Sequence, residues 1–276
     1  MIAPEQRLSA YLANLGPAAI AVSGGVDSMT LAVLGHRHNP GIGIFHAVSP
    51  AVPAQATQRV QRYAKSEGWR LHIIDAGEIE DPEYLANPAN RCYFCKTNLY
   101  DTIVQNTSGL VLSGTNLDDL GDYRPGLTAA QEHQVCHPYV ECQITKAMLR
   151  DIARSLALGD LQDLPAAPCL SSRIETGIRI NPQVLPIINQ VEQLLWDRMP
   201  SHLDLTAVRC RVRSEGIVIE LETAQSDPAL NDVMDLIIGT AREAFSAAGF
   251  KDMTEAVRVE PYQRGSAFLI ETLAVE

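Results

Sequence analysis

The chain of 276 residues is short of positive charge and of long hydrophobic runs. It has 22 Lys and Arg residues against 33 Asp and Glu residues, which gives a formal net charge of −11. Because an acidic body gains little from counterion release on a polyanion, RNA and DNA are disfavoured as partners. No apolar run approaches the roughly 18 residues that a membrane span needs, so we expect no membrane partner. Glu5, Gln6 and Arg7 stand where a secretory signal would be apolar, and we therefore expect a cytoplasmic protein.

Internal repeats and low-complexity segments are also missing. With 46% hydrophobic residues, the chain is long enough to bury a core in one or two domains. Its six cysteines are poor candidates for disulfides in a reducing compartment, so their spacing is read first for metal or thiol chemistry.

Short apolar runs alternate with helical patterns in the first two-thirds of the chain. Four such runs predict strands, at 18–22, 42–48, 70–76 and 110–114. Strands separated by helices predict a doubly wound parallel sheet of the α/β class. Ligands bind such sheets at the carboxyl ends of the strands. The turn after the first strand, Ser49 and the segment that begins at Gly114 should therefore converge on one crevice.

The pattern changes after about residue 180. We expect helices at 182–199 and 227–249, and strands at 205–212, 216–222, 255–262 and 266–273. These elements predict a smaller α+β domain. The predicted domains are 1–180 and 181–276.

The stretch "AVSGGVDSM" at 21–29 is a glycine-rich turn between a strand and a helix. Such a turn lets backbone N–H groups approach an anion at the helix N-terminus. Ser23 and Ser28 add hydroxyl donors, and Asp27 suggests a Mg²⁺ partner or a ribose contact. The lysine of the P-loop pattern is absent. The alternative is an ordinary turn that uses Gly24 and Gly25 for tightness.

Two cysteines, Cys92 and Cys95, form a C-x-x-C pair in "NPANRCYFCKTNLY". One such pair is too small for a closed tetrahedral zinc site. The neighbouring Arg91 and Lys96 would lower the thiol pKa and favour thiolate. The alternative is a pair of buried cysteines at a helix start.

The segment "SGTNLDDLGDYRPG" places polar side chains just beyond a strand end. Its carboxylates, among them Asp118, Asp119 and Asp122, could hold Mg²⁺, and Arg124 could hold a phosphate. The alternative is a solvated acidic loop.

A third segment, "LPAAPCLSSRIETG", sets Cys169 just before Ser171, Ser172 and Arg173. A cation and hydroxyls close to a thiol make an electropositive pocket of the kind that activates cysteine. The alternative is a small buried hydrophobic residue.

Together, S-G-G-V-D-S, R-C-Y-F-C-K, G-T-N-L-D-D-L-G-D-Y-R-P-G and P-C-L-S-S-R-I resemble the LarE family within the PP-loop ATP pyrophosphatase superfamily. The likeness covers residues 1–180 in order and spacing and is looser beyond them. Two departures occur there: Ser214-Glu215 stands where a histidine is common, and Gln263-Arg264 shifts an arginine by one place.

The resemblance implies a sheet of the PP-loop, or adenine nucleotide alpha hydrolase, type and an enzyme that splits ATP into AMP and pyrophosphate. LarE proteins adenylate a pyridinium carboxylate carried on a mononucleotide and convert it to a thiocarboxylate for the nickel-pincer nucleotide cofactor. The implied cofactors are ATP and Mg²⁺. The implied assembly is a homo-oligomer, a trimer or a hexamer.

The resemblance also implies roles for individual residues. The ATP phosphates would be held by Ser23, Gly24, Gly25, Asp27 and Ser28, and the adenosine would be lined by Ser49, Gly114 and Thr115. The reacting end would lie near Asp118 and Arg124. The substrate phosphate would meet Arg173, Arg211, Arg213 and Arg264.

Two sources of sulfur remain open. In the sacrificial form of the family, the cysteine at the position of Cys169 gives up its own sulfur and ends as dehydroalanine. In the other form, Cys92, Cys95 and Cys169 would bind three irons of a [4Fe–4S] cluster, whose fourth iron could hold an exogenous sulfide. We favour the cluster, since loss of a protein atom at each turnover makes the protein a reagent. Cys136, Cys142 and Cys210 are predicted to be buried structural thiols, and His137 has no predicted role.

Three rival functions share parts of this pattern. A tRNA thiolation enzyme would share the glycine loop and paired cysteines, but the low pI of about 5.1 and the lack of a basic extension count against it. An amide-forming synthetase of the NAD or GMP synthetase type would not need the three cysteines. A nucleotide-binding regulator could use the same crevice without catalysis.

Overall fold

The computed structural model describes residues 2–121, 124–165, 168–223 and 232–269. They belong to two compact units, unit 1 (residues 1–84 and 90–167) and unit 2 (85–89 and 168–276). Residues 168–180, which the sequence analysis placed in the first domain, are therefore part of unit 2. The reason is their contacts with later residues of unit 2: Glu175 N donates to Val212 O at 2.9 Å, and Arg173 pairs with Glu192.

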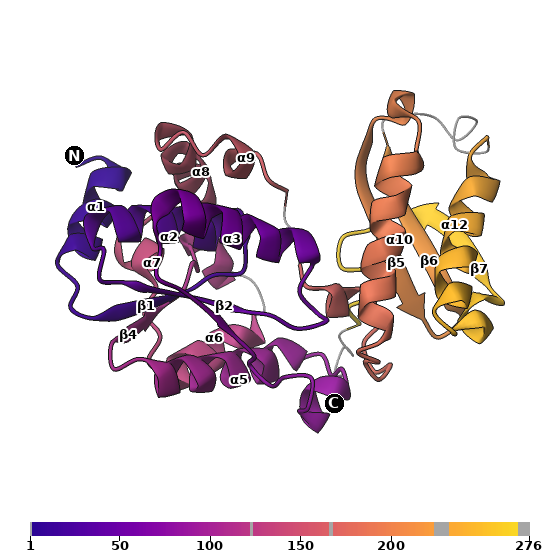
Figure 1. Cartoon of the computed structure of the whole chain (residues 1–276), viewed down its shortest axis with the longest axis horizontal. Helices are drawn as coiled ribbons and strands as arrows, with labels where there is room; N and C mark the ends of the chain where they lie inside the picture. The colour runs from indigo at the N-terminus through magenta and orange to yellow at the C-terminus, as the bar shows by residue number, and fades with distance from the viewer. Residues whose placement is uncertain (1, 122–123, 166–167, 224–231, 270–276) are drawn as a thin grey trace, which may run out of the picture. The chain divides into compact units, whose positions relative to one another are not determined.

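Unit 1 is built on a four-stranded parallel sheet in the order β3-β2-β1-β4 (Figure 1). Its strands are β1 (Ala18–Ala21), β2 (Gly43–Ala47), β3 (Leu71–Ile74) and β4 (Leu110–Leu112). All four predicted strands are present, each slightly shorter than its apolar run. The arrangement is a Rossmann-like α/β fold, and the predicted α/β class is confirmed at that level.

Helices cover both faces of this sheet because the side chains of its strands alternate. Ile20 of β1 faces a core shared with one group of helices, whereas its neighbours Ala19 and Ala21 face a second core. The first group contains α1 (Pro4–Ala13), α2 (Val26–His38), α3 (Ala54–Glu67), α7 (Pro138–Glu141), α8 (Lys146–Ser155) and α9 (Gly159–Gln162). The second group contains α5 (Arg91–Asn106) and α6 (Pro125–Glu132). Each fully buried aliphatic side chain contributes about 1.5–3 kcal/mol.

Two short helices of the first 121 residues connect these elements. They are α4 (Pro82–Leu85) and the 3₁₀ turn η1 (Leu117–Gly121). The termini of α3 follow local chemistry: the helix begins after Pro53 and ends at Gly68, whose φ of +71° suits glycine.

Unit 2 contains a smaller sheet in the order β5-β6-β7. Its strands are β5 (Leu205–Arg213), β6 (Gly216–Thr223) and β7 (Val257–Pro261), with β5–β6 antiparallel and β6–β7 parallel. Helix α10 (Val184–Arg198) packs against β5, and α12 (Met234–Ala247) packs against β7 and α10 (Figure 1). The described part of unit 2 also contains the 3₁₀ turns η2 (Leu170–Arg173), η3 (Ser201–Leu203) and η4 (Lys251–Thr254).

The predicted strand at 266–273 is wrong over its described part. Residues 266–269 are turn and irregular chain, because Phe268 N donates back to Gly265 O at 2.8 Å. Residues 270–273 lie outside the described residues, as do 227–231 of the predicted helix. Within the described segments, we find no helix whose length and hydropathy would let it span a membrane.

Candidate functional site

The predicted glycine loop connects β1 to α2 at the carboxyl edge of the unit 1 sheet. Gly25 caps α2, and Gly24 adopts a φ of +81°. Gly114 follows β4, the strand beside β1, and lies against the loop: a Cβ on Gly114 would be 2.8 Å from Ser28 N. Ser49 follows β2 on the other side of β1, where its Oγ accepts from Ala51 N. The structure thus brings Gly114 to the loop and sets Ser49 at the same edge.

The loop is closed by the hydroxyl group of Ser28. Its Oγ accepts from Ser23 N at 3.0 Å and donates to Gly25 O at 3.3 Å. The Ser23 hydroxyl lies 3.2 Å from that of Ser28, and Gly25 N lies 3.5 Å from Ser23 Oγ. Ser28 is buried and Ser23 is exposed. The loop therefore presents backbone N–H groups at the start of α2, where the helix dipole favours an anion.

Asp27 of this loop is paired with Lys146, a residue that the sequence analysis missed. The Lys146 Nζ atom lies 2.6 Å from Asp27 Oδ2, and both side chains are about one-third exposed. Lys146 opens α8, which Thr145 caps by accepting from Met148 N. One sequence signal could have found it: a lysine in the first turn of a helix opposes the helix dipole and needs a compensating anion.

The segment after β4 is held by its own side chains. Asn116 donates to Asp119 Oδ2 from both its backbone N, at 3.0 Å, and its Nδ2, at 2.9 Å. Arg124 pairs with the other oxygen of Asp119 at 2.7 Å. Asp118 Oδ2 accepts from the backbone N of Lys146. Asp122 lies outside the described residues.

Thr115 belongs to a short chain of polar groups beside this segment. The hydroxyl of Ser113 lies 3.0 Å from that of Thr115 and 2.8 Å from His137 Nδ1. Burial lowers the pKa of His137, so its ring is neutral near pH 7. His137 therefore orients hydroxyl groups here.

The predicted sulfur-site cysteines are divided between the two units. Cys92 and Cys95 lie near the start of α5 in unit 1, whereas Cys169 caps η2 in unit 2. Cys92 is exposed and Cys95 half-buried, which does not fit the alternative of two buried cysteines. Within either unit, no three His, Cys, Asp or Glu side chains of the described residues gather as a metal site.

Arg173 is buried and secures the chain around Cys169. Its Nε and Nη2 donate to the two carboxylate oxygens of Glu192 at 2.9 and 3.0 Å. Its Nη1 donates to Pro168 O at 2.8 Å and to Cys169 O at 3.3 Å. Glu192 also accepts from the backbone N of Cys210 on β5. This guanidinium is therefore already neutralised by a carboxylate, and its predicted contact with a substrate phosphate stays a prediction.

The other predicted arginines also lie in unit 2. Arg211 and Arg213 of β5 share the fully buried Glu220, at 3.0 Å from Arg211 Nε and 2.7 Å from Arg213 Nη2. Arg213 Nη1 donates to Glu260 at 3.0 Å, while its buried Nε finds no partner among the described residues. Arg264 is exposed in the turn after β7.

The remaining cysteines have the environment of structural thiols. Cys142 and Cys210 are buried, and Cys136 is half-buried. Burial raises the pKa of all three, which keeps them protonated.

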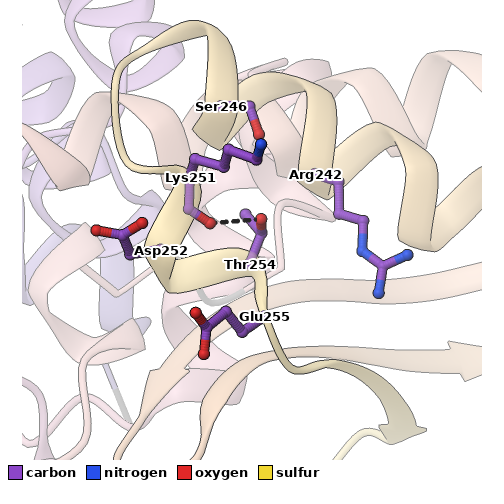
Figure 2. Close-up of a pocket in the computed structure, with 6 residues that line it drawn as sticks. All are labelled: Arg242, Ser246, Lys251, Asp252, Thr254 and Glu255. Carbon is purple, nitrogen blue, oxygen red and sulfur yellow. Dashed lines mark hydrogen bonds between the residues drawn. The ribbon is translucent and has the colours of Figure 1, made fainter.

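Two open hollows lie away from the predicted residues. The one in unit 2 has a volume of about 380 Å³, and both cations and carboxylates line it (Figure 2). Its lining residues are Arg242, Ser246, Lys251, Asp252, Thr254 and Glu255. The one in unit 1 has a volume of about 650 Å³, and in it Asp160 accepts from Tyr63 and pairs with Arg62. Cations and carboxylates offset one another in both, so neither provides a site of one charge.

Comparison with known proteins gives the chain a family. No protein-family model matches the sequence. An uncharacterized protein of Synechocystis sp. is 36% identical over 269 residues, which cover 94% of this chain and 95% of that protein. The chain belongs to the family of this cyanobacterial protein. Another relative in Methanocaldococcus jannaschii, also uncharacterized, is 27% identical over 248 residues and covers 88% of this chain and 90% of its own length.

A more distant relative has a named activity. The pyridinium-3,5-bisthiocarboxylic acid mononucleotide synthase of Lactiplantibacillus plantarum is 27% identical over 227 residues, or 79% of each chain. This relative supports the resemblance to the LarE family.

Proposed function

We propose that the protein is an ATP-dependent sulfur transferase that acts on the carboxylate of a pyridinium mononucleotide. The carboxylate oxygen would attack the α-phosphorus of ATP, so that pyrophosphate leaves and an acyl-adenylate forms. A sulfide sulfur would then attack the acyl carbon, so that AMP leaves with the bonding electrons and a thiocarboxylate remains. The observation that carries the proposal is the glycine loop at the sheet edge, whose backbone N–H groups can bind an anion. Gly114 lies beside Ser28 of this loop, and Lys146 pairs with Asp27. The named relative supports the choice of substrate.

The loop fits the phosphates that leave as pyrophosphate. Charge builds on them as the bond to the α-phosphorus breaks, and preorganised N–H groups stabilise such charge most strongly in the transition state. Gly24, Gly25 and the start of α2 would supply these donors, aided by the Ser23 hydroxyl. Ser49, Gly114 and Thr115 would line the adenosine.

Asp27 and Lys146 would interact with the Mg²⁺ ion and the phosphate oxygens of bound ATP. A carboxylate is a ligand that Mg²⁺ prefers, and Mg²⁺ brought with ATP would take the place of the ammonium group at Asp27. Lys146 would then turn to a phosphate oxygen. Asp118 and Arg124 would remain near the reacting carboxylate, where Arg124 could neutralise its charge as the two anions approach.

The cysteines fit a [4Fe–4S] cluster in their chemistry. Cys92 and Cys95 are three residues apart on one helix, so both thiolates can face the same way, and thiolate is the usual protein ligand of such clusters. Cys169 would be the third ligand. When bound, the cluster would present an open iron to an exogenous sulfide. In the alternative, Cys169 itself would supply the sulfur and become dehydroalanine.

Arginine side chains of unit 2 would bind the phosphate of the substrate. Arg213 keeps a buried Nε that lacks a partner among the described residues, and Arg264 is exposed in the adjacent turn. We propose these two residues as phosphate ligands. Arg211 and Arg173 would support them through Glu220 and the Cys169 segment.

Product analysis tests this function. Protein purified without oxygen is incubated with MgATP, sulfide and the pyridinium carboxylate mononucleotide, and AMP, pyrophosphate and thiocarboxylate are measured. Equal amounts of AMP and thiocarboxylate support the proposal. Pyrophosphate release that needs tRNA, or a product amide, would instead support a rival.

Metal analysis separates the two sulfur sources. A cluster predicts about four irons per chain with matching acid-labile sulfide, lost in Cys169→Ala and in Cys92→Ala. In the sacrificial form, folded protein reconstituted without oxygen holds no iron. The Cys169 peptide then loses the mass of one H₂S after turnover.

A further inference from the structure

The glycine loop is supported from outside by helix α3 of unit 1. Gly24 touches this helix directly: a Cβ built on Gly24 would lie 2.8 Å from Ala56 O and 2.9 Å from Ala56 Cβ. One turn further along α3, Arg59 Nη1 donates to Gly24 O at 2.8 Å. Ala56 and Arg59 are three residues apart, so they share the helix face that meets the loop.

A third contact from α3 reaches the residue just before the loop. Buried His46 Nδ1 lies 2.8 Å from Val22 O, and its Nε2 lies 2.9 Å from Thr57 Oγ1. Because a carbonyl oxygen can only accept, Nδ1 carries the proton and donates to Val22. The strand end and the loop are thus both anchored to α3.

The bond from Arg59 determines which way one peptide group faces. Gly24 O and Gly25 N–H belong to the same planar trans peptide, so they point in opposite directions. While Arg59 holds the carbonyl, the Gly25 N–H is directed to the other side, where the exposed Ser23 hydroxyl lies 3.5 Å away. That is the side on which an anion would approach the start of α2.

This peptide group is the one in the loop that most needs such a restraint. Glycine accepts positive and negative φ almost equally, so a peptide between two glycines turns over at little steric cost. A reversed peptide would present a carbonyl oxygen to the phosphates instead of a donor. A charged donor on the carbonyl also polarises the peptide and strengthens its N–H group.

We propose that Arg59 is a positioning residue that holds the Gly24–Gly25 peptide in the orientation that binds ATP. The inference rests on the proposed function, because it assumes that the loop binds the phosphates. Arg59 would act through the loop backbone, with its guanidinium on the far side of the peptide from the anion. Arg59 also brings a positive charge to the loop backbone.

The test compares Arg59→Ala with Arg62→Ala. Arg62 lies on the same helix and has the same charge, but it is more than half exposed and pairs with Asp160. MgATP affinity is measured by calorimetry, together with the affinity for the pyridinium mononucleotide and the thermal midpoint. We expect Arg59→Ala to weaken MgATP binding by about tenfold to a hundredfold, the range for a lost hydrogen bond to a charged group. Substrate affinity should not change, and Arg62→Ala should match the wild type.

Chemical rescue separates positioning from a general loss of structure. Guanidinium ion at a concentration too low to unfold the protein should restore MgATP binding to Arg59→Ala, and a sodium salt of equal ionic strength should not. If Arg59→Ala does not fold, Arg59→Lys, which keeps the charge and part of the reach, should bind MgATP more weakly than the wild type.

The outcomes also separate the inference from the proposed function. A folded Arg59→Ala protein that binds MgATP as tightly as the wild type overturns the inference and leaves the function standing. A folded wild type that binds no ATP overturns the function, and the inference with it.

Discussion

Single residues of the loop work under tight steric limits, and Gly24 shows this most clearly. Its φ of +81° lies in the left-handed region, and α3 leaves no room for a Cβ beside it. A side chain would meet both a strained backbone and a fixed carbonyl. The shape of the loop therefore depends on the absence of a side chain at Gly24.

We expect Gly24→Ala to weaken ATP binding and to lower the free energy of unfolding. The left-handed backbone alone costs a residue with a side chain about 1–2 kcal/mol, and relief of the contact with Ala56 requires the loop to move. Gly16→Ala is the control, because a Cβ at Gly16 would meet nothing within 4 Å. Thermal unfolding and MgATP calorimetry measure both effects. Equal results for the two variants would contradict this account.

In the proposed function, Lys146 balances charge in the ATP site, and we expect it to contribute little to stability. The ion pair with Asp27 is about one-third exposed, and such pairs contribute about 0–1 kcal/mol. We expect Lys146→Met to unfold near the wild-type temperature while pyrophosphate release falls about 10²–10³-fold, as when a transition-state donor is removed. Lys65→Met, an exposed change on α3, is the control. A large loss of stability with unchanged turnover would show that Lys146 is structural.

At the scale of elements, buried hydrogen bonds and ion pairs fix the positions of helices, strands and loops relative to one another within a unit. Hydrophobic contacts alone are not directional and would not do so. Glu192 of α10 joins η2 and β5 in this way, through Arg173 and the backbone N of Cys210. His46 links α3 to the end of β1. Each link fixes a loop that the proposed chemistry uses.

Glu192→Gln should destabilise the protein strongly, because it leaves the buried Arg173 cation without a counter-charge. Breaking a buried pair costs about 3–5 kcal/mol. Glu243→Gln is the matched control, since Glu243 faces Arg198 at 3.7 Å on the surface and its loss should cost less than about 1 kcal/mol. Urea unfolding measures both. A similar small effect in the two variants would refute the buried link.

The neutral state of His46 makes stability depend on pH. Burial lowers the pKa of His46 in the folded chain, whereas the unfolded chain keeps the ordinary value near 6.5. The unfolded state therefore binds the proton first as the pH falls, and the free energy of unfolding should decrease below about pH 6.5. Urea unfolding from neutral to mildly acidic pH should show a steeper decrease for the wild type than for His46→Asn, which cannot titrate. Parallel curves would exclude His46 as a cause.

Local patterns predicted the elements of unit 1 well, while contacts distant in sequence were missed. All four strands of the parallel sheet follow from apolar runs, although 110–114 shortens to Leu110–Leu112 because Ser113 already bonds to Cys136 O beyond the ladder. Lys146 was missed because 119 residues separate it from Asp27. The pairing of Arg173 with Glu192 was also missed, since a charged residue on an amphipathic helix resembles a solvated one.

At the scale of the whole molecule, the two units are joined by more than one stretch of chain. Residues 85–89 interrupt unit 1 and belong to unit 2. Asn87, which is fully buried and has a φ of +56°, attaches this segment to the rest of unit 2: its side-chain amide donates to the carbonyl groups of Glu175 and Ile178. The boundary predicted near residue 180 missed this, because composition does not change at 85–89.

Asn87→Gly should weaken this attachment without adding backbone strain, since glycine accepts the positive φ. Loss of the buried amide and of its bonds to Glu175 and Ile178 should cost about 1–3 kcal/mol. Asn106→Gly, which removes one exposed bond to Thr102 O at 2.8 Å, is a control for the loss of an amide. Hydrogen exchange of the Gly177 amide, which donates to Asn87 O, should be faster in Asn87→Gly. Unchanged exchange would mean that the segment is held by other contacts.

The predicted trimer or hexamer also belongs to this scale. Light scattering on the full chain checks it, and a monomer at all concentrations would contradict it.

The interruption at 85–89 has a consequence for the order of events during synthesis. Residue 87 emerges from the ribosome well before 175 and 178, the residues whose carbonyls its side chain binds. At about 5–20 residues per second, several seconds pass before these carbonyls exist. During synthesis, residues 85–89 therefore wait without their partners while the chain around them folds. Unit 2 cannot be completed from residues 168–276 alone.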